Sequence, residues 1–119
     1  MCPHPDRSDP PGLYDECRVV RPHGELGLTT VAAFAHALAD ACSGTGRRFL
    51  IVDLTKVTFM DGSALAPLSA AWDDCDSRNG WVRLVRGPAT AGLALRAGGL
   101  THRFPRYASA QDAWTGTLG

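Results

Sequence analysis

The residues of this sequence that could carry chemistry gather at Asp61-Gly62-Ser63, a polar cluster that follows two apolar segments. A carboxylate, a hydroxyl and a flexible glycine stand there at the start of a predicted helix. Free backbone N–H groups and the positive end of the helix dipole make such a position suited to binding. Aspartate is also a common helix cap. Both interpretations, a functional site and a simple cap, stay open at this point.

Catalysis is the chemistry that the sequence favours least. Asp53 and Asp61 could form a carboxylate pair, but Asp53 lies within an apolar segment, where a hydrogen-bonding role at a strand end is simpler. A nucleophile, a base and an orienting residue do not occur at a recognisable spacing. A glycine-rich phosphate loop is also missing. We therefore predict no catalytic residues and expect that the protein is not an enzyme.

The four cysteines give no metal-binding pattern. Cys2, Cys17, Cys42 and Cys75 are far apart, without a C-x-x-C pair, and neither His36 nor His102 completes a ligand spacing. We expect no metal, no cofactor and no disulfide framework. Cys42 and Cys75 lie on apolar helix faces, where a reduced cysteine behaves as a small hydrophobe.

Charge and length limit the classes of partner and the number of domains. Acidic and basic side chains balance at 12 each, so no long-range field favours nucleic acid or an anionic membrane. No apolar run approaches the roughly 20 residues of a membrane span, and the start of the chain does not read as a signal peptide. We expect a cytoplasmic protein, with a proline-rich, disordered tail over residues 1–12 and a single domain over residues 13–119.

The central element is a predicted strand from Phe49 to Leu54, whose nearly continuous apolar run is typical of a strand buried on both faces. After Asp61, a helix is predicted to begin near residues 62–66. Pro67 either bends this helix or takes its first position, on the exposed side in both cases. One face of the helix is apolar and is predicted to bury Leu65, Leu68, Trp72 and Cys75.

The remaining elements follow the same periodicities. Leu13-Tyr14 and Cys17 to Arg21 are predicted to form a hairpin that Pro22-His23-Gly24 ends. Two helices are predicted, one over Val31 to Cys42, which leaves His36 exposed, and one over Ala89 to Ala97, with Leu93 toward the core. The other predicted elements are a strand over Trp81 to Arg86, a short strand over Phe104 to Tyr107 and a last helix capped by Ser109 and Asp112. This order predicts an α/β fold, in which helices cover a small parallel or mixed sheet.

Four motifs in this order give the chain a family resemblance. They are Gly24-Glu25-Leu26, then Val52-Asp53-Leu54 with Val57 to Asp61, then Gly98-Gly99-Leu100, and Tyr107-Ala108-Ser109. The sequence resembles the STAS family over roughly residues 13–116, in particular its anti-sigma factor antagonists. The resemblance implies a STAS-like (anti-sigma factor antagonist) fold and an anti-sigma factor with serine kinase activity as partner. The alternative that it leaves open is a STAS interaction subunit of a lipid-transport ABC system or a stress-signalling complex.

The resemblance also implies where the partner binds. Family antagonists carry Asp-Ser-Ser-Gly at this point, and the kinase phosphorylates the first serine; here Gly62 occupies that position, Ser63 the second serine and Ala64 the glycine. Gly27 similarly falls where the family often has aspartate. The usual phosphate acceptor is missing, and Ser63 is the remaining hydroxyl. The partner-binding residues expected from the resemblance are Thr58, Met60, Asp61, Gly62, Ser63, Ala64 and Pro67.

Overall fold

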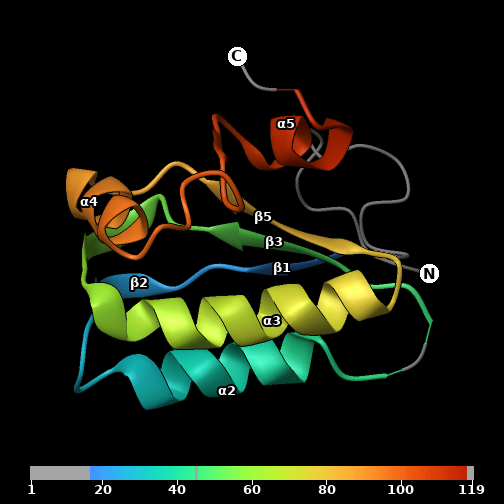
Figure 1. Ribbon diagram of the computed structural model, residues 1–119, viewed down its shortest axis with the longest axis horizontal. Helices are drawn as coiled ribbons and strands as arrows, with labels where there is room; N and C mark the ends of the chain where they lie inside the picture. Colours follow the sequence, from blue (N-terminus) through green and yellow to red (C-terminus); the bar gives the residue numbers. More distant parts are fainter. Residues whose placement is uncertain (1–16, 45, 118–119) are drawn as a thin grey trace.

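The computed structural model describes residues 17–44 and 46–117, and these form two parallel β-sheets with covering helices (Figure 1). The first sheet has the order β1 (Cys17–Val20), β3 (Phe49–Asp53), β5 (Trp81–Val85) and β6 (Arg106–Tyr107). The second sheet pairs β2 (His23–Leu26) with β4 (Lys56–Met60). The α/β architecture predicted from the sequence is confirmed, and every pairing in the described residues is parallel.

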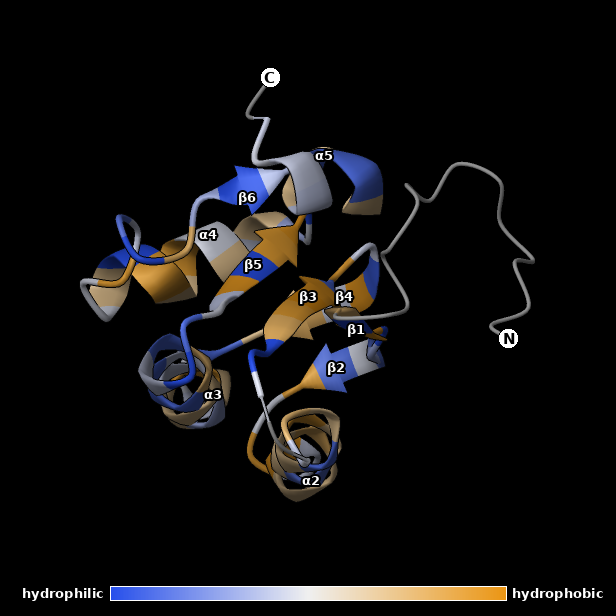
Figure 2. Ribbon diagram, turned by 90° about the vertical axis from the view of Figure 1, so that its right-hand side faces the viewer, coloured by the Kyte–Doolittle hydropathy of each residue, from blue (hydrophilic) through white to orange (hydrophobic). Residues whose placement is uncertain are grey.

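Helices cover both faces of the four-stranded sheet. The helices α2 (Val31–Ala41) and α3 (Leu65–Ser77) lie side by side on one face, and α5 (Ala110–Thr115) lies on the other (Figures 1 and 2). The remaining helix, α4 (Ala89–Ala97), lies near β4 and the 3-10 turn Gly62–Ala64. The start of α3 therefore lies close to α4.

The central strand is buried on both faces, as predicted. Leu50, Ile51 and Val52 are each 0% exposed. Leu50 and Val52 join the core beneath α2 and α3, whereas Ile51 joins a second cluster with Ala113 of α5. The alternating direction of strand side chains explains this division between the two faces.

The first strand ends before Pro22, as predicted, but the sequence showed no sign that a second strand, His23–Leu26, begins directly after it. Proline is tolerated directly before a strand, where its missing N–H removes no ladder hydrogen bond. Gly24 has a positive φ of 77°, and the register with β4 shifts between Gly24 and Glu25. The glycine therefore forms an irregularity within the strand pairing. Leu13-Tyr14 of the predicted hairpin lies outside the described residues.

The prediction for Leu93 is also wrong, because this side chain is 56% exposed. Ala91, Ala94 and Leu95 face the core from α4 instead. Apolar residues occur all around this short helix, so the sequence pattern does not define one face. Ala91 packs closely against Gly87, because a Cβ added at Gly87 would lie only 3.4 Å from the Ala91 Cβ.

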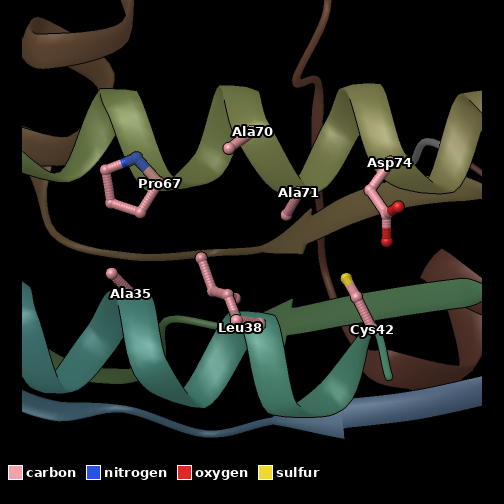
Figure 3. Close-up of a pocket in the computed structure, with 8 residues that line it drawn as sticks. Ala35, Leu38, Cys42, Pro67, Ala70, Ala71 and Asp74 are labelled. Carbon is pink, nitrogen blue, oxygen red and sulfur yellow. The ribbon is translucent and has the colours of Figure 1, made fainter. Parts of the chain in front are cut away.

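Three side chains of α3 differ from the expectation, and one of them, Leu65, is only partly buried. Trp72 is only partly buried, because its ring lies at the edge of the core under Arg103, whose guanidinium carbon is 4.3 Å from the ring centroid. Pro67 is only partly exposed, because it lines a cavity that opens between α2 and α3 (Figure 3). Leu68 and Cys75 are fully buried, as predicted.

Candidate functional site

The turn at Asp61 is held in place by its neighbour β2. The Asp61 backbone N–H donates to the carbonyl oxygen of Leu26 at 3.2 Å, directly after the last β2–β4 pair. The turn therefore stands at the carboxyl end of the second sheet, where parallel strands commonly present binding residues.

The carboxylate of Asp61 caps the start of the helix. Its Oδ1 accepts a hydrogen bond from the Ser63 backbone N–H at 2.8 Å. The turn Gly62–Ala64 is 3-10 helical, and α3 continues from Leu65. Pro67 lies in the first turn of α3, where proline is tolerated because few N–H groups have helical partners. The capping interpretation is confirmed, and the capped turn still faces solvent at Gly62.

Gly62 is not required by the local structure. Its φ is outside the positive range that favours glycine, and a Cβ at this position would meet no heavy atom within 4 Å. Any small side chain would fit there without strain. The backbone therefore does not demand glycine at position 62.

Gly27 has the opposite environment. A Cβ at this position would lie 3.1 Å from Oδ2 of Asp61, so a side chain would crowd the capping carboxylate. The loop around it is fixed by Thr30, whose hydroxyl donates to the Glu25 carbonyl at 2.7 Å and accepts from the Gly27 N–H at 3.0 Å. Thr30 is the N-cap residue of α2, but its side chain holds this loop instead of capping the helix.

The turn is tied to α4 as well. The Met60 backbone N–H donates to the hydroxyl of Thr90 at 3.0 Å. At the other end of α4, a Cβ on Gly98 would lie 2.5 Å from a methyl group of Leu65, so glycine allows the close approach of the two helices. Segments distant in the sequence therefore fix the position of the Asp61 turn.

The seven residues expected to bind a partner fall into two groups. Met60 and Ala64 are buried at 1% and 0% exposure, so their side chains support the turn from below. The others reach the surface, with Thr58 and Gly62 exposed and Asp61, Ser63 and Pro67 partly exposed.

Sequence reasoning missed three large apolar side chains on segments that border the turn. Leu28 is 80% exposed and Phe59 is 40% exposed, one shortly after β2 and the other within β4. Leu93, on α4, lies one helical turn beyond Thr90. The exposure of Phe59 could not be read from the sequence, because it sits in an apolar run typical of a buried strand.

The other candidate chemistry does not converge on the turn. The Asp53 carboxylate accepts from the Thr55 hydroxyl at 2.7 Å and from its N–H at 3.0 Å, so it closes the turn after β3, as expected of a strand-end role. Residues 17–44 and 46–117 contain no group of three His, Cys, Asp or Glu that could hold a metal ion. No helix in this part of the chain has the length and apolar character to cross a membrane.

Comparison with known structures identifies the fold. An anti-sigma factor antagonist from Mycobacterium paratuberculosis is 30% identical, with a TM-score of 0.67 over 87% of this chain and 86% of that one. The anti-sigma factor antagonist SpoIIAA in its unphosphorylated form is 19% identical, with a TM-score of 0.62 over 87% of this chain and 92% of that one. The STAS domain of a SulP transporter from Vibrio cholerae is 18% identical, with a TM-score of 0.58 over 85% and 82% of the two chains. None of the curated proteins is a significant match.

The family comparison agrees with these structures. The model of the STAS domain matches residues 13–113, which include the Asp61 turn and both sheets. The chain therefore belongs to the STAS domain family.

Proposed function

We propose that this STAS domain is an anti-sigma factor antagonist that binds an anti-sigma factor with serine kinase activity. The observation that carries the proposal is the capped turn at Asp61, which presents Gly62 to solvent. The family resemblance of the sequence is what assigns Gly62 to the position of the phosphorylated serine. A relative with 30% identity over most of both chains is an anti-sigma factor antagonist. The role requires binding alone, without a catalytic group or a cofactor.

The proposed docking surface consists of the exposed groups around the turn. Exposed apolar side chains that border polar groups are typical of protein-binding sites, and central apolar anchors often contribute most of the affinity. Leu28 is the strongest anchor candidate, because it is the most exposed of the large apolar side chains in the described residues. The docking surface comprises Leu28, Thr58, Phe59, Asp61, Gly62, Ser63, Pro67 and Leu93.

Gly62 keeps this position of the antagonist permanently unphosphorylated. A phosphate on a serine here would add about −1.5 to −2 charge to the docking surface. Glycine cannot accept phosphate, so the surface stays in the unphosphorylated form that a partner can approach. Control of binding by phosphate on this residue is thereby lost.

A binding screen tests the proposal. The purified chain is titrated calorimetrically against each kinase-type anti-sigma factor domain of the same genome. We expect one of them to bind with micromolar or tighter affinity and Leu28→Asp to weaken that binding. The matched control is His36→Asp, which adds the same charge on an exposed residue of α2. Failure of every kinase domain to bind the folded chain would contradict the proposal.

The alternative partners predict a different outcome of the same binding screen. A STAS subunit of a lipid-transport ABC system or of a stress-signalling complex would bind its own assembly and ignore the kinase domains. The likeness to the SulP domain shows the fold alone at 18% identity, so it does not favour this alternative.

A further inference from the structure

Two thiols that lie far apart in the sequence meet between α2 and α3. The Sγ atoms of Cys42 and Cys75 are 3.8 Å apart, although 33 positions separate the residues. Cys75 is 0% exposed and Cys42 is 8% exposed. A thiol pair at this distance needs only a small movement to reach the S–S bond length of about 2.05 Å.

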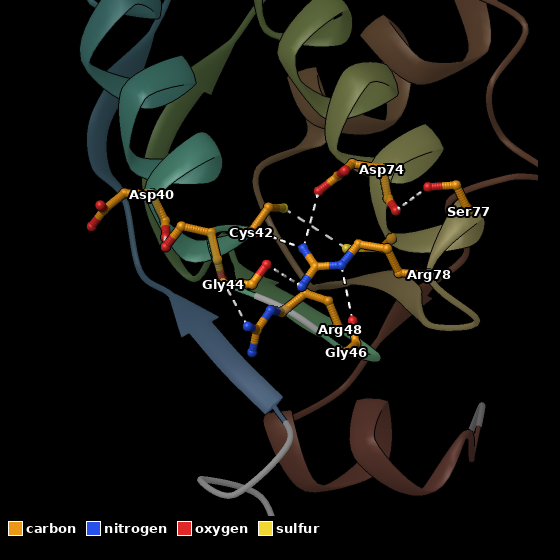
Figure 4. A network of polar contacts seen from close by, with 10 residues as sticks. Asp40, Cys42, Gly44, Gly46, Arg48, Asp74, Ser77 and Arg78 are labelled. Carbon is orange, nitrogen blue, oxygen red and sulfur yellow. Dashed lines mark hydrogen bonds and ion pairs between the residues drawn. The ribbon is translucent and has the colours of Figure 1, made fainter.

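The surrounding polar groups hold this thiol pair in alignment. Arg78, directly after α3, donates to the carbonyl oxygens of Cys42, Gly44 and Gly46 (Figure 4). A second arginine, Arg48, donates to the Ser43 carbonyl at 2.7 Å. The end of α2 is therefore tied to the end of α3 by hydrogen bonds that do not depend on the thiols.

A cavity gives a small molecule access to one of the two sulfurs. It has a volume of about 270 Å³ and lies between α2 and α3, with Cys42 and Asp74 at one end and Ala35 and Pro67 at the other (Figure 3). Its space is many times that of a water molecule, which is close in size to hydrogen peroxide. Cys42 lines this cavity, whereas Cys75 does not line it and is fully buried.

The two thiols also differ in acidity. The pKa of the Cys42 thiol lies below its ordinary value, chiefly because the Cys75 thiol hydrogen-bonds to it. The Arg78 cation also lowers this pKa, whereas burial and the Asp74 carboxylate oppose the shift. The pKa of the Cys75 thiol is raised by its hydrogen bond with Cys42 and by burial. The thiolate is the reactive form, so the accessible Cys42 is the expected nucleophile.

We propose that Cys42 and Cys75 form an oxidation site at which a hydroperoxide converts the thiol pair into a disulfide joining α2 to α3. The Cys42 thiolate attacks one peroxide oxygen, the O–O bond breaks, and hydroxide leaves. The Cys75 sulfur then displaces the oxygen from the Cys42 sulfenic acid as water, which takes up the Cys75 proton. Overall, the two thiols lose two electrons, and hydrogen peroxide is reduced to two waters.

The oxidation needs no partner protein, so it can be tested with the protein alone. The fully reduced full-length chain is treated with hydrogen peroxide, alkylated and digested with trypsin. Each of the four cysteines lies on a different tryptic peptide, because an arginine or lysine cleavage site separates every pair. We expect a Cys42–Cys75 linked peptide, a loss of two hydrogens in the intact mass, and full reversal by dithiothreitol.

Two variants test the assigned order of events. With Cys75→Ala, Cys42 should stop at the sulfenic acid, which dimedone traps; with Cys42→Ala, Cys75 should give no dimedone adduct at the same peroxide exposure. Circular dichroism checks that both variants fold. If either variant does not fold, the proposal is decided by the disulfide that peptide mapping finds in the unmutated protein. Linkage only through Cys2 or Cys17, or no linkage in the folded protein, would show that the thiol pair acts as core packing and would overturn the proposal.

Discussion

Replacement of Gly62 by serine should create a phosphate acceptor, if Gly62 occupies the position of the family's phosphorylated serine as proposed above. The added side chain would enter open space, because a Cβ at Gly62 has no heavy atom within 4 Å and the φ is not in the left-handed range. Serine is also a better helix former than glycine by about 0.5 kcal/mol. We therefore expect Gly62→Ser to leave the free energy of unfolding unchanged or raised by up to about 0.5 kcal/mol.

The unmutated protein should remain unphosphorylated, although Ser63 is adjacent. Residues 62–64 form a 3-10 turn, in which neighbouring side chains differ in direction by about 120°. A catalytic geometry tolerates errors of roughly 0.5 Å. The Ser63 N–H is also bound by the Asp61 carboxylate, so redirecting this residue would break the cap.

Phosphate on the new serine should weaken partner binding strongly. It would bring about −1.5 to −2 charge next to Asp61, within the proposed docking surface. An unpaired charge at a desolvated contact costs about 2–5 kcal/mol, which corresponds to a loss of affinity of about 30- to 5,000-fold. Unphosphorylated Gly62→Ser should bind as the unmutated protein does.

Intact-mass spectrometry decides this prediction. The partner kinase and ATP are incubated with the unmutated protein, with Gly62→Ser and with the control Gly62→Ala, which makes the same backbone change without a hydroxyl. Only Gly62→Ser should gain phosphate. Stoichiometric phosphate on Ser63 of the unmutated protein would refute the reasoning, as would a Gly62→Ser variant that binds the kinase but is never modified.

Three further predictions concern binding and stability. Leu28→Ala should weaken partner binding about tenfold in calorimetry. It should change the free energy of unfolding by less than about 0.5 kcal/mol, because Leu28 is 80% exposed. Binding equal to that of the unmutated protein would remove Leu28 from the docking surface. Trp72→Ala should lower the free energy of unfolding by about 2 kcal/mol in urea titration. This loss is smaller than the roughly 3–5 kcal/mol expected for a fully buried tryptophan, because the Trp72 ring is partly exposed beneath Arg103. Thr90→Val should lower the free energy of unfolding by about 1–2 kcal/mol, because it leaves the Met60 N–H unpaired. Thr90→Ser keeps the hydroxyl and should not lower it. Equal losses of stability in the two variants would contradict this role for the hydroxyl.

Local patterns were sufficient for most of the fold. The apolar run of β3 marks a buried strand, and the bounds of α4 follow from the Gly87-Pro88 and Gly98-Gly99 pairs at its ends. The capping role of Asp61 was also readable, because the carboxylate and the N–H that it binds are two residues apart. In each case the signal and the structure lie within one short segment.

Features that depend on packing between distant segments could not be predicted in this way. β2 is a strand because β4 pairs with it, although Pro22 and Gly24 suggest a break. The apolar faces that carry Cys42 and Cys75 were recognised, but the contact of the two sulfurs depends on how α2 packs on α3. The exposure of Leu93 likewise follows from which of several apolar faces of α4 meets the core.

The parallel pairing of all described strands has a consequence for how the protein folds. Each of these strands is separated from its partner by at least one helix in the chain, so no hairpin of described strands can act as a local folding nucleus. The hydrogen bond from Asp61 to Leu26 forms only once β2, α2, β3 and β4 are in place. A nascent chain that ends before β4 therefore lacks the proposed docking surface, and partner binding must wait for the completed fold.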